Sequence, residues 1–294
     1  MFDRLERFYD AVPRDGAVAE DIGSLVLFVR KGAGWPYYAR PRLAADRAPS
    51  AADITAVRNR QRALGVPETF EWIHEHDPDL LAVVRSTGLQ VLLAPLMVLK
   101  VAALLPDLPL PGARVRLADP TSGRFGADIA ARHAVGQLGF AVPAGSPPDA
   151  PGAGPVPIDE LAPDGTLVAG PAGPAERDAI PPPPIEHIAD ERRRTAAGLV
   201  VSGLVESPTE GVLASGLLQR VGRVAEIAGV ATLPSARHRG YATQLTAALA
   251  RRAVSDGADL VCLAAGDDDV ARLFSRVGFR RIGTACIAEP AATV

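Results

Sequence analysis

Hydrophobic residues recur along the chain with two spacings, and the spacing separates helices from strands. Residues 242–255 place Leu245 and Leu249 on one face of a helix, whereas compact apolar runs such as residues 25–29 and 260–265 favour strands. Glycine directly after a helical pattern marks the end of a helix, because it adopts the left-handed conformation without strain. The expected helices are residues 2–12, 52–64, 77–86, 124–138 (ended by Gly139), 184–197, 242–255 and 269–277, and the expected strands are residues 25–29, 35–39, 69–73, 91–99, 115–118, 199–205, 212–219, 224–233, 260–265 and 280–288.

This order of elements predicts an α+β fold with one mixed, mostly antiparallel sheet flanked by helices. The two halves of the chain also end alike, each with helix, strand, helix, a Gly–apolar pair and a final strand. The Gly–apolar pair is Gly88-Leu89 in the first half and Gly278-Phe279 in the second. The similarity suggests two tandem copies of one fold.

Two proline-rich stretches divide the chain. Residues 106–112 form a short, stiff connector, because proline continues neither a helix nor a central strand. Residues 143–184, rich in Pro, Gly and Ala, are expected to be a mostly irregular surface insertion. The expected domains are therefore residues 1–105, the connector, and residues 113–294 with the insertion at about 143–184.

Composition narrows the class of protein. Hydrophobic residues make up 48% of the chain and charged residues 22%, which supports a packed core, and the formal net charge of -3 argues against a nucleic-acid-binding surface. Two cysteines make neither a disulfide framework nor a zinc site. The most apolar run, residues 91–105, is interrupted by Pro95 and Lys100 and is too short to span a bilayer. We expect a cytoplasmic protein without a signal peptide, a metal, a nucleic-acid partner or a membrane partner; the oligomeric state stays open.

One segment carries recognisable chemistry. In residues 230–242 a strand ends, turns through Pro234 and enters a helix at Arg237-His238-Arg239-Gly240-Tyr241-Ala242. A helix N-terminus offers free backbone N–H groups and partial positive charge, which suit a diphosphate. Gly240 lets the backbone approach a ligand closely, and the arginines can add charge-assisted bonds. The alternative is a solvated, Arg-rich turn, but the order of strand, turn and amphipathic helix favours an anion site.

This segment resembles the acetyl-CoA signature of the GNAT acyltransferase superfamily. The resemblance rests on Arg237-x-x-Gly240-x-Ala242 after a Val230-x-Thr232-x-Pro234 strand end, on Leu273-Phe274-x-x-x-Gly278-Phe279, and on Ala225-Glu226-Ile227. The specific match covers residues 225–288, with weaker likeness back to about residue 114. The first half resembles a degenerate copy, because it lacks the Arg-x-x-Gly-x-Gly/Ala loop. We therefore expect a tandem protein with one working coenzyme site.

The resemblance implies roles for particular residues. Backbone groups of Val230, Ala231 and Thr232 would pair with the pantetheine arm and could polarise the thioester carbonyl. Asp267 aligns with a position that often contacts the coenzyme, although it can equally be a helix N-cap. The diphosphate would be held by Arg237 and the loop backbone of His238, Arg239, Gly240, Tyr241, Ala242 and Thr243.

Two positions concern catalysis. Glu226 aligns with a strand carboxylate that serves several family members as a general base, directly or through water; the alternative is a carboxylate that only solvates the cleft. Phe274 stands where the family often has a tyrosine that protonates the leaving thiolate. Since phenylalanine cannot donate a proton, water or another donor must act, or catalysis is slow. Phe274 would still pack against the coenzyme.

The resemblance thus implies an acetyl-CoA-dependent N-acetyltransferase in which a primary amine attacks the thioester directly in a ternary complex. The amine belongs to a small molecule or a peptide that the sequence does not identify. An alternative from another class is a catalytically weak acyl-CoA sensor or scaffold, which Phe274 and the degenerate first half would favour.

Overall fold

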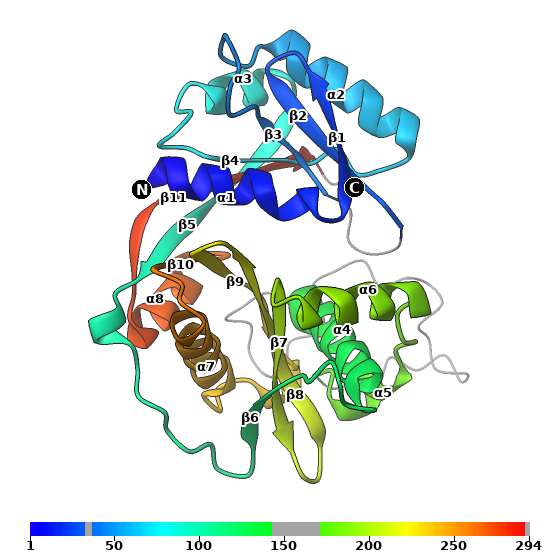
Figure 1. Ribbon diagram of the computed structural model, residues 1–294, viewed down its shortest axis with the longest axis vertical. Coiled ribbons are helices and arrows are strands. Elements are labelled where there is room, and N and C mark those ends of the chain that lie inside the picture. Colours follow the sequence, from blue (N-terminus) through cyan, green and yellow to red (C-terminus); the bar gives the residue numbers. More distant parts are fainter. Residues whose placement is uncertain (33–36, 143–170, 292–294) are drawn as a thin grey trace.

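In the computed structural model, which describes residues 1–32, 37–142 and 171–291, one twisted sheet of eleven strands runs through both halves of the chain (Figure 1). The helices are α1 (Phe2–Arg14), α2 (Ala51–Leu64), α3 (Leu80–Ser86), α4 (Phe125–Ala141), α5 (Pro174–Ala179), α6 (Ile185–Ala196), α7 (Tyr241–Ser255) and α8 (Asp268–Val277), with short 3-10 turns at Val101–Ala103 and Pro234–Ala236. The strands are β1 (Ala17–Ile22), β2 (Leu25–Arg30), β3 (Ala39–Pro41), β4 (Phe70–Ile73), β5 (Leu89–Leu99), β6 (Arg114–Leu117), β7 (Val200–Ser207), β8 (Gly211–Val221), β9 (Val224–Thr232), β10 (Leu260–Ala264) and β11 (Phe279–Pro290).

The expected α+β class, with a mostly antiparallel sheet, is confirmed, and the two halves repeat one topology. In the first half β3 runs parallel to β4 with α2 between them in sequence, and in the second half β9 runs parallel to β10 with α7 between them. Each half then continues through a helix, a glycine and a long strand, as the Gly–apolar pairs indicated. All other strand pairs are antiparallel.

The halves exchange their last strands. The strand order is β1-β2-β3-β4-β11-β5-β10-β9-β8-β7-β6, so β11 from the second half lies between β4 and β5, while β5 from the first half lies between β10 and β11. The two exchanged strands pair with each other along almost their whole length, from Phe279 opposite Leu99 to Pro290 opposite Leu89. A continuous sheet therefore joins the two expected domains, whose boundaries stay a prediction.

Proline inside β5 does not break this central pairing. Pro95 lies opposite Thr284 of β11, and its carbonyl accepts from the backbone N–H of Ala265, just past the end of β10. The nitrogen and the carbonyl of a strand residue point to the same side of the strand. The Pro95 nitrogen, which carries no hydrogen, therefore faces the end of β10, where hydrogen bonding between β5 and β10 has ended. The pairing of β5 with β11 is thus left intact.

Helix α1 lies between the two halves (Figure 1). It packs against β8 and β9 on one side and against β1, β2 and β4 on the other. Its apolar face contributes Leu5, Phe8 and Val12 to a core that also contains Val224 and Cys262 of the second half. The first half thereby reaches the strands that precede the predicted coenzyme loop.

Three local expectations need correction. The strand β1 was missed, because its sequence AVAEDI carries two acidic residues and lies at the sheet edge. Helix α4 does not end at Gly139 but continues to Ala141, since a Cβ at Gly139 would lie 2.8 Å from the Cβ of Ala231, and the glycine serves this close approach. The expected strand 35–39 is wrong in its described part, because Tyr37 and Tyr38 precede the strand β3, which begins at Ala39; residues 35 and 36 lie outside the described residues. Residues 143–170 of the expected insertion also lie outside the described residues, and the described remainder contains the short helix α5.

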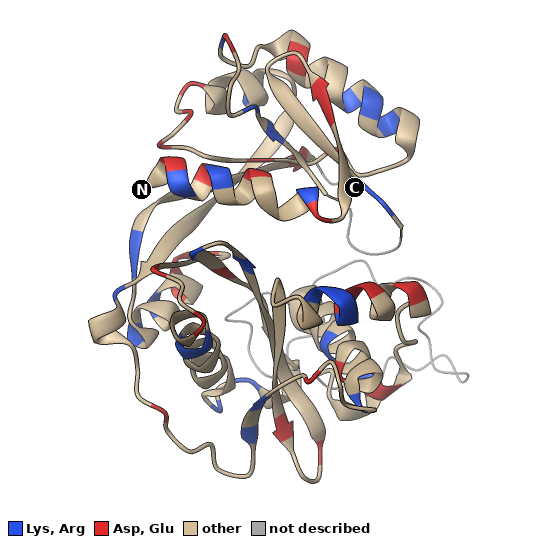
Figure 2. Ribbon diagram, in the orientation of Figure 1, with Lys and Arg blue, Asp and Glu red and all other residues tan. Residues whose placement is uncertain are grey.

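Basic and acidic residues are interspersed along the ribbon in both halves of the described chain (Figure 2). Many form ion pairs across the surface, such as Arg60 with Glu20 at 2.8 Å and Arg193 with Asp15 at 3.0 Å. Among the described residues, no helix combines the length and the hydropathy needed to cross a bilayer.

Candidate functional site

The end of β9 separates from β10 and leaves one side of its backbone without a partner strand. Parallel pairing with β10 stops at Glu226 opposite Cys262. Shortly afterwards Gly229 adopts a left-handed φ of 60°, and Gly229 and Val230 form a bulge against β8. A bulge bends and twists its strand. Residues 230–232 therefore continue β9 beyond the end of its pairing with β10, with β8 as their partner strand on the other side.

Beyond this strand end, the chain turns into α7 with an uncapped N-terminus. Gly240 is the N-cap residue with φ 78°, no side chain caps the helix, and its first turn contains no acidic residue. A Cβ at Gly240 would meet nothing within 4 Å, so the space in front of the helix is open among the described residues. The backbone N–H groups of Tyr241, Ala242 and Thr243 are those that a helix cannot satisfy internally. An uncapped helix start with free N–H groups is the kind of site that suits an anion, and the predicted diphosphate site at this loop stays a prediction.

The equivalent helix of the first half is closed by its own side chains. At the start of α2, Ser50 Oγ accepts from the backbone N–H of Asp53, and Asp53 in turn accepts from the backbone N–H of Ser50 at 2.8 Å. Arg47 donates two hydrogen bonds to the same carboxylate and holds the pKa of Asp53 below its ordinary value. An internal carboxylate thus occupies the position that a diphosphate would take. This gives the degenerate first copy a physical basis.

The arginines of the second-half loop have different surroundings. Arg237 donates to the carbonyls of Gly139 and Val142 at 2.8 and 2.7 Å, so it binds the C-terminal end of α4. Arg239 is half exposed and donates to Ser235 O and, at 3.4 Å, to Glu210. His238 is exposed and has a φ of 63°, the one positive φ among the described non-glycine residues. Arg239 is therefore the better placed of the two arginines to reach a bound phosphate.

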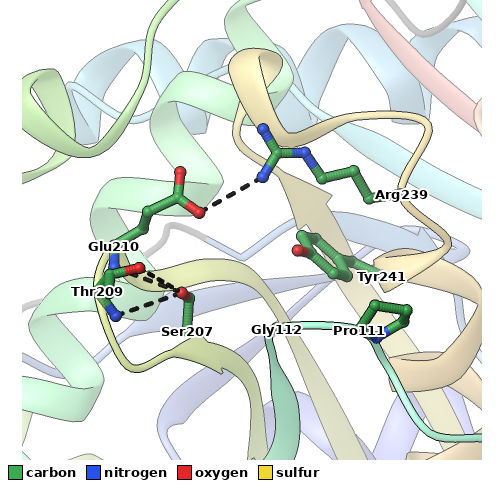
Figure 3. A pocket seen from close by; sticks show the side chains of 7 residues that line it. All are labelled: Pro111, Gly112, Ser207, Thr209, Glu210, Arg239 and Tyr241. Atoms are coloured by element: carbon green, nitrogen blue, oxygen red, sulfur yellow. Dashed lines mark hydrogen bonds and ion pairs between the residues drawn. The ribbon is translucent and has the colours of Figure 1, made fainter.

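A pocket of ≈ 460 Å³ lies beside this loop, on the flank of β7 and β8 (Figure 3). The guanidinium of Arg239 points to Glu210 across its mouth, and the ring of the largely buried Tyr241 lies next to Pro111. The pocket is lined by Pro111, Gly112, Ser207, Thr209, Glu210, Arg239 and Tyr241.

Glu226 sits on the same strand as the backbone groups described above, four residues before Val230. Its side chain is part-buried and accepts hydrogen bonds from Tyr9 Oη to Oε1 at 3.0 Å and from Gln219 Nε2 to Oε2 at 3.3 Å. Burial raises the pKa of Glu226 to about 7, although the hydrogen bonds and the nearby Arg40 act in the opposite direction. A carboxyl group that titrates near neutral pH is suited to general base catalysis.

The two remaining predicted residues have structural roles that are visible directly. Asp267 is the N-cap of α8 and accepts from the backbone N–H of Val270 at 2.8 Å, so the helix-cap interpretation describes its contacts. Phe274 is buried in the core, and its ring meets Phe279 edge-on at 6.5 Å between centroids. Neither side chain offers a proton to a leaving group.

One group of side chains in the described part of the chain has metal-ligand spacing. Atoms of Glu6, His76 and Asp77 lie within 4.8 Å of one another. However, Glu6 is buried in an ion pair with Arg40 and accepts from the backbone N–H of Ile73 at 3.0 Å. Both of its oxygens are therefore engaged, and the group does not fit a metal ion.

Known proteins resemble the chain in its second half by sequence and along its whole length by fold. Residues 201–288 match the family model of the FR47-like proteins. A GCN5-related N-acetyltransferase from Kribbella flavida superposes with a TM-score of 0.66 at 20% identity, covering 99% of this chain and 96% of the other. A tandem GNAT protein from the clavulanic acid biosynthesis pathway superposes with a TM-score of 0.51 at 13% identity, covering 93% and 80%. The chain has a tandem GNAT fold. No curated protein matches its sequence significantly.

Within this GNAT fold, the neighbours of the predicted loop and of the Glu226 carboxylate could not be predicted from the sequence. Tyr9 and Gln219, the two donors to Glu226, carried no local signal, because Tyr9 is 217 residues away from Glu226 in sequence. Gly139 could have been recognised as a packing glycine only with knowledge that α4 crosses the end of β9.

Proposed function

We propose that this GNAT protein is an N-acetyltransferase that moves an acetyl group from acetyl-CoA to the primary amine of a small molecule or a peptide. The observation that supports it best is the combination of a part-buried carboxylate on β9, a strand end that no longer pairs with β10, and an uncapped helix that follows it. The extended strand end fits a pantetheine arm, and the start of α7 fits a diphosphate. A cytoplasmic location belongs to this proposal, since acetyl-CoA is a cytoplasmic metabolite.

The proposed reaction is direct attack in a ternary complex. The acceptor ammonium first loses a proton, for which Glu226 is the base. The amine nitrogen then bonds to the thioester carbonyl carbon, and the carbonyl oxygen becomes negative near the backbone N–H groups at the end of β9. Collapse of the tetrahedral intermediate breaks the carbon–sulfur bond and releases the thiolate, while the nitrogen gives its second proton to water.

Geometry favours a water between Glu226 and the amine. Four residues of strand separate Glu226 from Val230, which is about 13 Å along the backbone. A glutamate side chain covers only part of that distance, so the proton would pass through an ordered water. The thiolate can take its proton from water too, since Phe274 is buried and has no proton to give.

The test is release of free thiol from acetyl-CoA in the presence of a panel of amines, amino acids and aminoglycosides. We expect amine-dependent thiol release, initial rates that require both substrates at once, and no acetylated protein by mass spectrometry. Gly240→Asp serves as the matched control, because it should lose the coenzyme while keeping the fold.

The buried Phe274 favours one second candidate, a coenzyme-binding module with little catalysis. Binding of acetyl-CoA by calorimetry, together with no thiol release above the control for any amine, would support that module and contradict the enzyme.

A further inference from the structure

The hydroxyl of Tyr9 connects the first half of the chain to the carboxylate in the second. Tyr9 lies on α1 and donates to Glu226 Oε1 at 3.0 Å. Its oxygen also lies 3.9 Å from the sulfur of Cys262, which stands opposite Glu226 on β10. The residue is part-buried, so the contact is shielded from bulk water.

The first half holds Tyr9 in place from two sides. Tyr38, just before β3, donates its hydroxyl to the backbone carbonyl of Tyr9 at 3.1 Å. The guanidinium of the fully buried Arg40 lies 5.5 Å from the centre of the Tyr9 ring and is ion-paired with Glu6, one turn earlier on α1. Glu6 is itself fixed by the backbone N–H of Ile73 on β4. A chain of direct contacts thus runs from β3 and β4 to the carboxylate.

The groups that face Glu226 come from five elements and the segment before β3. Tyr9 (α1) and Gln219 (β8) donate to it, and Arg40 (β3) favours its charged form. Glu71 (β4) is close enough for mutual repulsion, and burial with this repulsion raises the pKa of Glu71 to about 8. Cys262 (β10) and Tyr38 interact with Glu226 electrostatically. Tyr9 makes the shorter of the two hydrogen bonds to the carboxylate.

We propose that Tyr9 is a positioning residue for acyl transfer: its hydroxyl fixes the Glu226 carboxylate and stabilises its charged form, so that the first half, which has no open coenzyme site, supplies part of the catalytic machinery. The inference rests on the proposed role of Glu226 as the base.

Tyr9 remains a donor over the whole working range of pH. Burial, followed by the neighbouring Cys262 and Glu226, raises the pKa of Tyr9 well above its ordinary value, so the phenol keeps its proton. A hydrogen bond donated to a carboxylate favours the ionised form and lowers the pKa of the carboxyl group. Removing the hydroxyl should therefore raise the pKa of Glu226 from its value of about 7.

The experiment compares Tyr9→Phe, which keeps the ring that packs over Arg40, with the wild-type full chain. The titration of Glu226 is followed by carbon NMR of protein labelled at the glutamate carboxyl carbons, with the resonance assigned by its loss in Glu226→Gln. We expect Tyr9→Phe to move this titration upward by about one pH unit. The acidic limb of turnover should move by the same amount, with unchanged affinity for acetyl-CoA.

Two further variants separate hydrogen bonding from packing. Tyr37→Phe deletes a comparable part-buried phenol, whose ring lies 5.1 Å from the Arg30 guanidinium, and should leave the Glu226 titration where it is. Replacing Tyr9 by 3-fluorotyrosine makes the phenol a stronger donor and should move the titration downward. Opposite shifts from removing and strengthening one donor would not arise from a purely structural role.

An unchanged Glu226 titration in folded Tyr9→Phe would overturn the inference and leave the proposed acetyltransferase intact. A titration that moves while the pH profile of turnover stays fixed would show that Glu226 is not the base, and would remove both the proposed role of Glu226 and that of Tyr9. If the Glu226 titration and the pH profile of turnover move together, upward in Tyr9→Phe and downward with 3-fluorotyrosine, the proposed roles of Glu226 and Tyr9 are both supported.

Discussion

Gly240→Asp offers a sharp test of the coenzyme site, because the first half already contains the arrangement it would create. At α2, the carboxylate of Asp53 sits at the helix N-terminus, whereas α7 begins at Gly240 with no side-chain cap. The substitution would place a carboxylate in front of α7. The position has room for a Cβ, and Asp is among the residues that tolerate a φ of 78° and cap helices well. We therefore expect the variant to fold.

The loss of binding can be estimated from the contacts that the carboxylate would displace. A charge-assisted hydrogen bond is worth about 1.5–3 kcal/mol, and an anion at a helix N-terminus gains about 0.3–1 kcal/mol. Losing one such bond and the helix contribution costs about 3 kcal/mol, which weakens the Kd for coenzyme A by roughly 150-fold. The free energy of unfolding should change by less than about 1 kcal/mol.

Calorimetry with coenzyme A measures this directly, and Gly240→Asn is the matched control. Asn has the shape of Asp and the same tolerance of left-handed backbone, but no charge. It should lose no more than about tenfold in affinity, in keeping with a shape effect of about 1 kcal/mol. Wild-type affinity in a folded Gly240→Asp protein would show that the diphosphate does not bind at the start of α7.

Four other outcomes follow from the structure. Because Ser50 and Asp53 close α2 while α7 is open, calorimetry should find one coenzyme site per chain, and two equal sites would contradict this reasoning. With a folded-state pKa of about 7, above its ordinary 4.5, Glu226 works as a base only above neutral pH, so Glu226→Gln should lower turnover most above pH 7. Because the pKa of Glu226 is raised in the folded state, the free energy of unfolding falls as pH rises from about 4.5 to 7. Glu226→Gln should therefore have a higher melting temperature than the wild type at pH 8, and this difference should vanish toward pH 4.5. The same melting temperature for the two proteins at both pH values would speak against a buried charge. Phe274→Tyr should keep coenzyme affinity and raise turnover with a competent amine, and lost binding would mean that the buried site has no room for a hydroxyl.

Local pattern predicted most elements because caps and periodicity act within a few residues. Gly65, Gly88 and Gly278 end or follow their helices as expected, and α7 and α8 begin within a residue of the predicted starts. The strand, turn and helix of the loop proposed to bind the coenzyme were predictable for the same reason, because they are contiguous.

What the sequence did not reveal is non-local. The exchange of β5 and β11 could not be predicted, because the periodicity of each segment predicts a strand but does not indicate which strands it pairs with. Arg237 binds carbonyl groups of α4, which lies about a hundred residues earlier in the sequence. Glu226 accepts a hydrogen bond from Tyr9 on α1, which lies more than two hundred residues earlier. Charge and position in a motif suggested that Arg237 binds phosphate, but tertiary packing gives it carbonyl partners in this structure.

The exchanged strands also set the order in which the chain can be completed during synthesis. The first half leaves the ribosome first, yet the place between β4 and β5 is filled only when β11 has been made. Until the second half is made, one edge of β4 and both edges of β5 lack their partner strands, and such edges are where unwanted pairing with other chains begins. Deleting the first half would leave the same kind of defect in the second, since β10 and β11 would face each other across the empty place of β5. Each half of the chain therefore depends on the other for a complete sheet, so neither is expected to fold correctly by itself.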